Sequence, residues 1–199
     1  EGSGRHVVSS DRGHMTVRTL RMMTPRLELR RFEVSDAEAC FRNWMSDPEV
    51  AAFTTWPPHK DVSETEGILS SWVAEYGCGS MDWCIVWSQT GKPIGSITAV
   101  RDHPDEGWCE IGYCLSQEYW DRGIMTEALT AVTRYIFDRT DYTFIQARYD
   151  TENEASGRVL EKCNYRSVGE RELPDPKTGI MRTYRFMRLL RSDVMLFVD

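Results

Sequence analysis

The chain has 199 residues, of which 41% are hydrophobic and 28% charged, and its formal net charge is −7. These values are typical of one globular domain with a substantial core. The acidic balance argues against a nucleic-acid partner, because phosphate binding needs a basic face, and it is compatible with a cationic acceptor.

Cysteine spacing and the length of apolar runs bear on metal binding and location. None of the six cysteines has C-x-x-C spacing, and no histidine pair has zinc-finger spacing, so we expect no metal site. Scattered cysteines are typical core residues of proteins in a reducing compartment. The sequence contains no signal-like or transmembrane apolar run, and we therefore expect a cytoplasmic protein without a membrane partner.

Residues 1–21 are polar and without periodicity, and they contain Gly13-His14-Met15, which resembles the remnant of an expression tag. We expect this leader to be flexible or partly foreign to the protein. The remaining chain shows no repeat, linker or low-complexity tract. It is expected to form one domain over residues 22–191, followed by a C-terminal tail over residues 192–199.

The first half of the domain begins with a strand at residues 26–30, where polar and apolar residues alternate. Two amphipathic helices are expected next, one after residue 36 and one near residues 62–76. Their apolar faces comprise Ala37, Cys40, Phe41, Trp44 and Met45 in the first helix, and Ile68, Leu69, Trp72, Val73 and Tyr76 in the second. Three strands follow, at about residues 83–87, 93–100 and 108–115, and turn residues join them into a meander.

The second half changes character after residue 115, where a turn containing Gly123 leads into a helix. A strand at residues 142–149, a second helix after the capping-box sequence of residues 151–154, and two last strands at residues 165–170 and 182–190 complete the domain. The order is β-α-α-β-β-β-α-β-α-β-β. It predicts a mixed α/β (α+β) fold with six to seven strands, in which one strand–helix–strand crossover is parallel.

The turn over residues 122–126 has the features of an anion site. The first N–H groups of a helix have no intrahelical partners, and the helix dipole adds positive potential there. Gly123 permits close approach of the backbone, and Thr126 adds a hydroxyl donor. A glycine before a helix is also common in plain tight turns, so this motif alone is a weak signal. The chain contains neither a P-loop sequence nor G-x-G-x-x-G.

Five segments of the chain together carry a resemblance to a known family. They are TPRLELR at 24–30, DPEV at 47–50, EIGYCL at 110–115, YWDRGIMTEAL at 119–129 and NEASGRVLEKCNY at 153–165. Together they resemble the GNAT superfamily of N-acetyltransferases, and more narrowly the branch that contains the ribosomal-protein N-terminal (Rim-type) acetyltransferases. The resemblance spans about residues 25–190.

The sequence departs from the family pattern at several positions. One is Glu161, which stands near a helix tyrosine that serves as general acid in some members, so that role must move elsewhere. In the pyrophosphate signature, Trp120 and Met125 stand where the family usually has Gln or Arg and Gly or Ala. This change is tolerable because backbone amides do the binding. Asn164 replaces a usual glycine, and asparagine is the next-best residue for a left-handed helix C-terminus.

The resemblance implies a single GNAT-like domain with a splayed central strand pair, and acetyl-CoA as cosubstrate. The residues implied to bind it are Tyr113, Cys114 and Leu115 on the splayed strand, Arg122, Gly123, Ile124, Met125 and Thr126 in the pyrophosphate turn, and Asn153 and Ser156 on the following helix. Asn153 could instead only cap its helix, although Thr151 offers another cap.

Catalysis of acetyl transfer needs a base for the amine and a proton donor for the leaving sulfur. Glu110, which acts through a water, is the candidate base, and Ser156 is the candidate donor. The alternatives are a solvated strand-end carboxylate and an ordinary helix serine. The candidates for contacting the acceptor are Glu110 and Trp56, which lies in the loop of residues 54–60. The spacing of Trp44, Trp72, Trp83 and Trp87 is typical of core residues.

The function implied is an acetyl-CoA-dependent N-acetyltransferase that moves the acetyl group directly to a primary amine. By family resemblance, a protein N-terminal α-amine is the first acceptor to consider. A small-molecule amine, such as a polyamine or an amine antibiotic, is the enzymatic alternative, and a non-catalytic acyl-CoA sensor is a different class. A monomer or a homodimer is expected.

Overall fold

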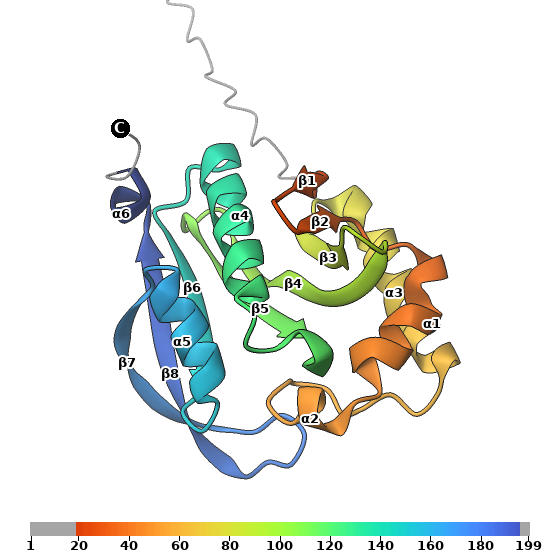
Figure 1. Ribbon diagram of the computed structural model, residues 1–199. Coiled ribbons are helices and arrows are strands. Elements are labelled where there is room, and N and C mark those ends of the chain that lie inside the picture. Colours follow the sequence, from red (N-terminus) through yellow and green to blue (C-terminus); the bar gives the residue numbers. More distant parts are fainter. Residues whose placement is uncertain (1–18, 196–199) are drawn as a thin grey trace, which may run out of the picture.

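Within residues 19–195, which the computed structural model describes, an eight-stranded sheet runs in the order β1-β2-β3-β4-β5-β6-β8-β7 (Figure 1). The strands are β1 (Met22–Met23), β2 (Leu27–Arg30), β3 (Asp82–Trp87), β4 (Lys92–His103), β5 (Trp108–Leu115), β6 (Phe144–Asp150), β7 (Arg166–Pro174) and β8 (Met181–Leu190). The helices are α1 (Ala37–Cys40), α2 (Pro48–Ala51), α3 (Val62–Glu75), α4 (Ile124–Arg139), α5 (Glu154–Lys162) and α6 (Arg191–Met195). Neighbouring strands are antiparallel, except that β5 and β6 are parallel.

The element order confirms the mixed α/β fold and the parallel crossover predicted from the sequence. Strand β1 and helix α6 were not expected. The expected leader lies outside the described residues up to residue 18, but Thr19 is buried: its hydroxyl donates to the Ser80 carbonyl and accepts from the Asp82 amide. Helix α6 begins at Arg191, and residues 196–199 of the expected tail are again outside the described part.

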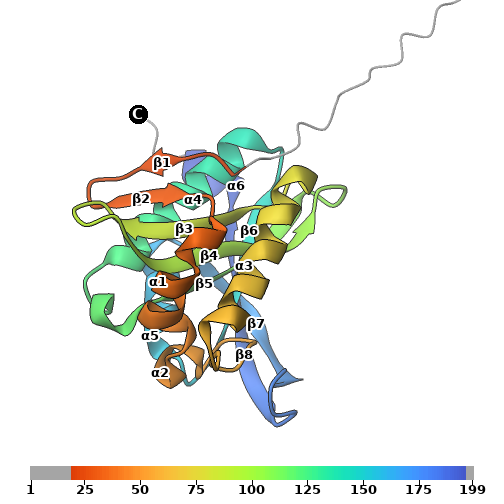
Figure 2. The same cartoon turned by 90° about the vertical axis from the view of Figure 1, so that its right-hand side faces the viewer.

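Helices cover the sheet on both faces, with α4 and α5 on one and α1 and α3 on the other (Figures 1 and 2). Strand β3 shows how the two cores arise, because successive side chains point to opposite faces. Trp83 and Ile85 pack in the core under α4 and α5, and Cys84 and Val86 pack in the core under α1 and α3. Buried on both faces, β3 therefore has the continuous apolar sequence of a central strand.

The predicted apolar faces of the first two helices are only partly buried. Ala37, Cys40, Trp44 and Met45 are buried in the core under α1 and α3, as expected. In α3, Leu69 is buried, but Ile68 and Val73 are exposed. The prediction for those two residues was wrong because α3 rests on the sheet along a narrower stripe than its sequence pattern indicates.

Strands β5 and β6 diverge halfway along their length. They pair only from Trp108 opposite Phe144 to Ile111 opposite Ala147. Beyond this point β5 stays paired with β4, and β6 stays paired with β8. The edge of β5 over residues 112–115 that faces β6 is therefore open, which confirms the splayed strand pair.

Candidate active site

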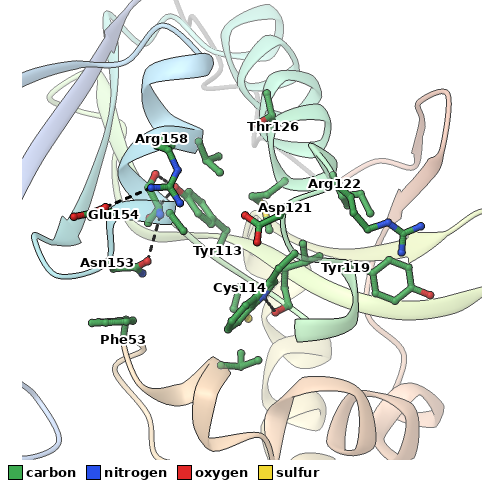
Figure 3. A pocket seen from close by; sticks show the side chains of 18 of the residues that line it. Phe53, Tyr113, Cys114, Tyr119, Asp121, Arg122, Thr126, Asn153, Glu154 and Arg158 are labelled. Carbon is green, nitrogen blue, oxygen red and sulfur yellow. Dashed lines mark hydrogen bonds and ion pairs between the residues drawn. The ribbon is translucent and has the colours of Figure 1, made fainter.

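A cavity of about 580 Å³ lies where β5 and β6 diverge, between α4, α5 and the segment around α2 (Figure 3). It is lined by all the residues that the family resemblance implies for acetyl-CoA: Tyr113, Cys114, Leu115, Arg122, Gly123, Ile124, Met125, Thr126, Asn153 and Ser156. The cavity also reaches residues 49–54 on the opposite side, so it extends past the open β5 edge toward α2.

The turn that opens α4 is shaped by two left-handed residues, Asp121 with φ of 56° and Gly123 with φ of 70°. Helix α4 begins at Ile124, and the Gly123 N-cap contributes no side-chain acceptor. Within the described residues, no protein acceptor is found for the amides of residues 122–126. Free amides and the helix dipole together give the turn the physical features of an anion site.

Glu127 anchors this turn to the start of β2. Its carboxylate accepts hydrogen bonds from the Thr24 hydroxyl at 2.7 Å and from the Arg26 amide at 2.9 Å, and it pairs with Arg26 Nε at 2.7 Å. Burial raises the pKa of Glu127, but these hydrogen bonds outweigh burial and hold it below its usual value. Arg26 Nη1 in turn donates to the Arg122 carbonyl. The Glu127 carboxylate is thus neutralised by Arg26, and its hydrogen bonds hold the turn against the start of β2.

The Arg122 side chain points toward Tyr119 rather than toward the centre of the cavity (Figure 3). Its guanidinium lies 5.1 Å from the Tyr119 ring centroid and 5.3 Å from that of Trp87. Cation–π contacts of this kind hold the side chain in place. The backbone of Arg122, rather than its charge, is therefore the part that faces the phosphate site.

The open edge of β5 supplies backbone groups, and its side chains point to the two faces of the sheet. Trp120 Nε1 donates to the Leu115 carbonyl at 2.8 Å, which occupies the last carbonyl of the strand. The Cys114 thiol hydrogen-bonds to Ser96 Oγ. Burial raises the pKa of Cys114 to about 11, although its bond with Ser96 lowers it slightly. Cys114 is therefore a neutral thiol at pH 7.

Helix α5 brings Asn153 and Ser156 to the cavity. Asn153 is the N-cap, and its Oδ1 accepts from the Ser156 amide at 3.3 Å. The capping role predicted for Thr151 was wrong, because the helix begins later. Ser156 Oγ lies 3.0 Å from the Tyr113 hydroxyl, which also donates to the Ser156 carbonyl. Gly157 permits this docking, since a Cβ there would lie 2.7 Å from the Tyr149 ring.

Two cationic side chains on α5, Arg158 and Lys162, also line the cavity. Arg158 pairs with Glu154 at 3.6 Å, and Lys162 lies one turn further along the helix. Their spacing placed them on one face, but only the seating of α5 beside α4 turns that face toward the phosphate turn. They add positive charge to the same end of the cavity as the free amides.

Glu110 is placed differently from the cofactor residues, because it does not line the cavity. It is buried on the face of β5 opposite to Tyr113. Oε1 accepts from Arg101 at 2.9 Å and lies 3.3 Å from Arg148 Nε, and Oε2 accepts from Gln146 at 2.7 Å. The partners come from β4 and β6, the two neighbours of β5.

Trp56, the other predicted acceptor residue, also lies outside the cavity lining. It packs against the core under α1 and α3 and against the His59 ring. Phe53 and Thr54 of the same loop line the cavity instead, and Phe53 is exposed there. Lys177, in the β7–β8 loop, donates from Nζ to the carbonyls of Ala51 and Ala52, which ties that loop to the end of α2.

Two further findings concern the described residues. No group of three or more His, Cys, Asp or Glu side chains there could hold a metal ion. No helix among them is both long and apolar enough to cross a membrane.

Comparisons of the sequence and of the fold with known proteins both find acetyltransferases. Residues 26–166 match the acetyltransferase (GNAT) domain family. An uncharacterized N-acetyltransferase, p20 of Bacillus licheniformis, is 28% identical over 174 residues, which cover 86% of this chain and 97% of p20. The [ribosomal protein uS5]-alanine N-acetyltransferase of Escherichia coli (strain K12) is 37% identical over 62 residues, 31% of each chain.

A solved structure with a similar fold is the microcin C7 self-immunity acetyltransferase MccE in complex with acetyl-CoA and AMP. Its TM-score is 0.76 at 14% identity, and the match covers 84% of this chain and 93% of MccE. Because the family match spans most of the domain and contains the cavity-lining turn and strand, the chain belongs to the GNAT family and is an N-acetyltransferase.

Proposed function

We propose that this enzyme transfers an acetyl group directly from acetyl-CoA to the α-amine at the N-terminus of a polypeptide. The observation that carries the proposal is one continuous cavity, which joins the free amides of residues 122–126, the open edge of β5 and the segment around α2. The first part suits a pyrophosphate, the second a chain of amides such as pantetheine, and the third an acceptor.

The roles of the binding residues follow from this order. The amides of residues 122–126 hold the pyrophosphate, with Arg158 and Lys162 adding charge at that end. The β5 backbone at Tyr113 pairs with the pantetheine arm along the open edge, because the carbonyl of the next residue, Cys114, points to β4. Asn153 uses Oδ1 to cap α5, so its amide nitrogen is the group available to that arm.

Two groups are proposed for the proton transfers. Tyr113, held by Ser156, donates a proton to the departing sulfur. Glu110 accepts the amine proton through a water, from the sheet face opposite Tyr113. A neutral Cys114 thiol is a poor nucleophile, which favours direct transfer over an acetyl-cysteine route.

A polypeptide acceptor is favoured over a small amine by two observations. Helices α1 and α3 do not cover β7 and β8 on their side of the sheet (Figure 2), which leaves room there for residues after the first. One relative is named for acetylating the alanine of a ribosomal protein. The alternative acceptor is a small-molecule amine, such as a polyamine or an amine antibiotic, which would not need an open sheet face beside the cavity.

The test is an acceptor screen that measures CoA release with N-terminal peptides, polyamines and amine antibiotics. Peptides with a free α-amine are expected to be the best acceptors, and N-formylated versions should be inactive. Glu110→Gln should lower kcat. Glu118→Gln is the control, because the exposed Glu118 carboxylate pairs with Lys92 at 2.9 Å away from Glu110, and it should leave kcat unchanged. Acetyl-CoA binding without CoA release from any acceptor would identify a sensor, and turnover of polyamines alone would contradict the peptide acceptor.

A further inference from the structure

The uncovered sheet face carries four arginine side chains around one buried carboxylate. Arg101 and Arg148 share Glu110, whereas Arg171 and Arg188 have no carboxylate partner among the described residues. These four residues, which we term the arginine face, come from β4, β6, β7 and β8. One carboxylate balances one of the four charges, so the face keeps a local positive excess within an acidic protein.

Aromatic rings hold the unpaired guanidinium groups in place. Arg188 lies 4.3 Å from the Phe144 ring centroid and donates to Gln146 Oε1 at 3.0 Å, while Arg171 lies 5.1 Å from the Phe186 centroid. Gln146 continues the network by donating to Glu110. Guanidinium groups that are already oriented lose less entropy when they bind a carboxylate.

A hollow of about 170 Å³ opens between these two arginines. It is lined by Gln146, Val168, Gly169, Glu170, Arg171, Phe186 and Arg188. The β-bulge at Val168 interrupts the pairing of β7 with β8 beside the hollow. Its size suits one carboxylate side chain rather than a folded partner.

The other end of the same face has the opposite charge. Arg182 pairs with Asp150, Glu152 and Asp175, so three carboxylates share one guanidinium. Glu152 and Glu154 also line the main cavity. A positively charged α-ammonium group is therefore attracted to the cavity end of the face, and a negative group to the hollow.

We infer that the acceptor is a polypeptide N-terminus followed by an acidic residue that binds in the hollow between Arg171 and Arg188. Gln146 lines the hollow, and Asp150, whose carboxylate accepts from the amide of the cavity-lining Glu152, is four residues further along β6, which corresponds to about 13 Å. An extended peptide covers this distance in about four residues, so the acidic side chain belongs near position five. This inference rests on the proposed peptide acceptor.

The experiment uses neutral octapeptides with a free N-terminus and a single Glu placed at each of positions three to seven. In the wild type, kcat/KM is expected to rise about three- to tenfold for Glu near position five, as for oriented ion pairs at a partly exposed site. The preference should shrink at high ionic strength, because salt screens such pairs.

Two variants and one control locate the effect. Arg171→Gln combined with Arg188→Gln should bring the ratio between acidic and neutral peptides to about one. Arg171→Glu, a change on an exposed strand, should make Lys the preferred residue at the same position. Arg134→Gln, an exposed position on α4, should keep the wild-type ratio. The acetyl-CoA-induced thermal shift of each variant shows whether it is folded.

Equal kcat/KM values for all peptides, or a preference that survives both arginine variants, would overturn the inference and leave the proposed function intact. Failure of every peptide while polyamines are acetylated would overturn both. A change in oligomeric state caused by Arg171→Glu, without a change in peptide preference, would assign the hollow to a second copy of the chain and contradict the inference.

Discussion

The Tyr113 hydroxyl and Ser156 Oγ lie 3.0 Å apart across the gap where β5 and β6 diverge. This contact joins the open strand to α5 inside the cavity. Burial raises the pKa of Tyr113, and the bond with Ser156 offsets only part of that rise. The hydroxyl therefore stays protonated throughout the neutral range, as a proton donor must.

Removing the Tyr113 hydroxyl tests this role. Tyr113→Phe keeps the ring but should lower kcat about tenfold to a hundredfold, since general acids contribute at least this much, while acetyl-CoA affinity changes little. Because the raised pKa favours the protonated form, the wild type should show no alkaline loss of kcat from this group below about pH 10. Steady-state kinetics from pH 6 to 10 measure both effects. A kcat within twofold of wild type in Tyr113→Phe would assign proton donation elsewhere.

Gly123 has a matched control in Gly91, because their φ values are 70° and 69°. An alanine at either position has space but must adopt a left-handed backbone, which costs about 1–2 kcal/mol. Both variants should lose similar thermal stability. Only Gly123→Ala should weaken acetyl-CoA binding, because it distorts the amides of residues 122–126. Titration of acetyl-CoA into both variants checks this, and equal affinities would remove the turn from the cofactor site.

Substitutions of Phe53 and Trp56 distinguish a side chain that contacts the acceptor from a neighbouring one that only packs in the core. Phe53→Ala should raise the KM of the peptide acceptor more than that of acetyl-CoA, because Phe53 lines the cavity near α2. Trp56→Ala should chiefly lower stability, since Trp56 packs against the core under α1 and α3. Kinetics with both substrates and thermal unfolding distinguish them. The opposite result, with only Trp56→Ala raising the acceptor KM, would place the acceptor on the outer side of the loop.

Glu127 should stabilise the fold in a pH-dependent way. Glu127→Gln is expected to lose about 1–2 kcal/mol of unfolding free energy at pH 7, because a partly buried carboxylate that accepts charged hydrogen bonds is replaced by a neutral amide. Because the folded pKa of Glu127 is depressed, its contribution is complete above the unfolded value of about 4.3 and disappears as pH falls through the folded value. The difference from wild type should therefore narrow between about pH 5 and pH 3. Urea unfolding measures it, and a difference independent of pH would contradict this account.

The conformation of the turn over residues 122–126 could be predicted from sequence because its determinants are local. Gly123 adopts the left-handed conformation that such a turn needs, and Asn164 adopts it at the end of α5, as its residue type indicates. The apolar periodicity of each segment likewise predicted whether it forms a strand or a helix, and so the order of the elements along the chain. These features depend on neighbours along the chain.

The surroundings of Glu110 and Trp56 could not be predicted in this way. Arg101 and Arg148 reach Glu110 only because of the registers of β4 and β6 against β5. Phe53 and Trp56 are both aromatic residues of the connection between α2 and α3. The packing of this connection against the core under α1 and α3 decides which of the two rings faces the cavity. Pairing between distant strands and loop packing leave no periodic signal in the sequence.

Hydrogen exchange with and without saturating acetyl-CoA locates the bound cofactor, because it reports on backbone amides individually. We expect slower exchange at the amides of residues 122–126 and along the open β5 edge at residues 113–115. The amides of the β3–β4 turn around Gly91 should be unaffected. Protection confined to other segments, or no protection at acetyl-CoA concentrations that raise the unfolding temperature, would contradict this expectation.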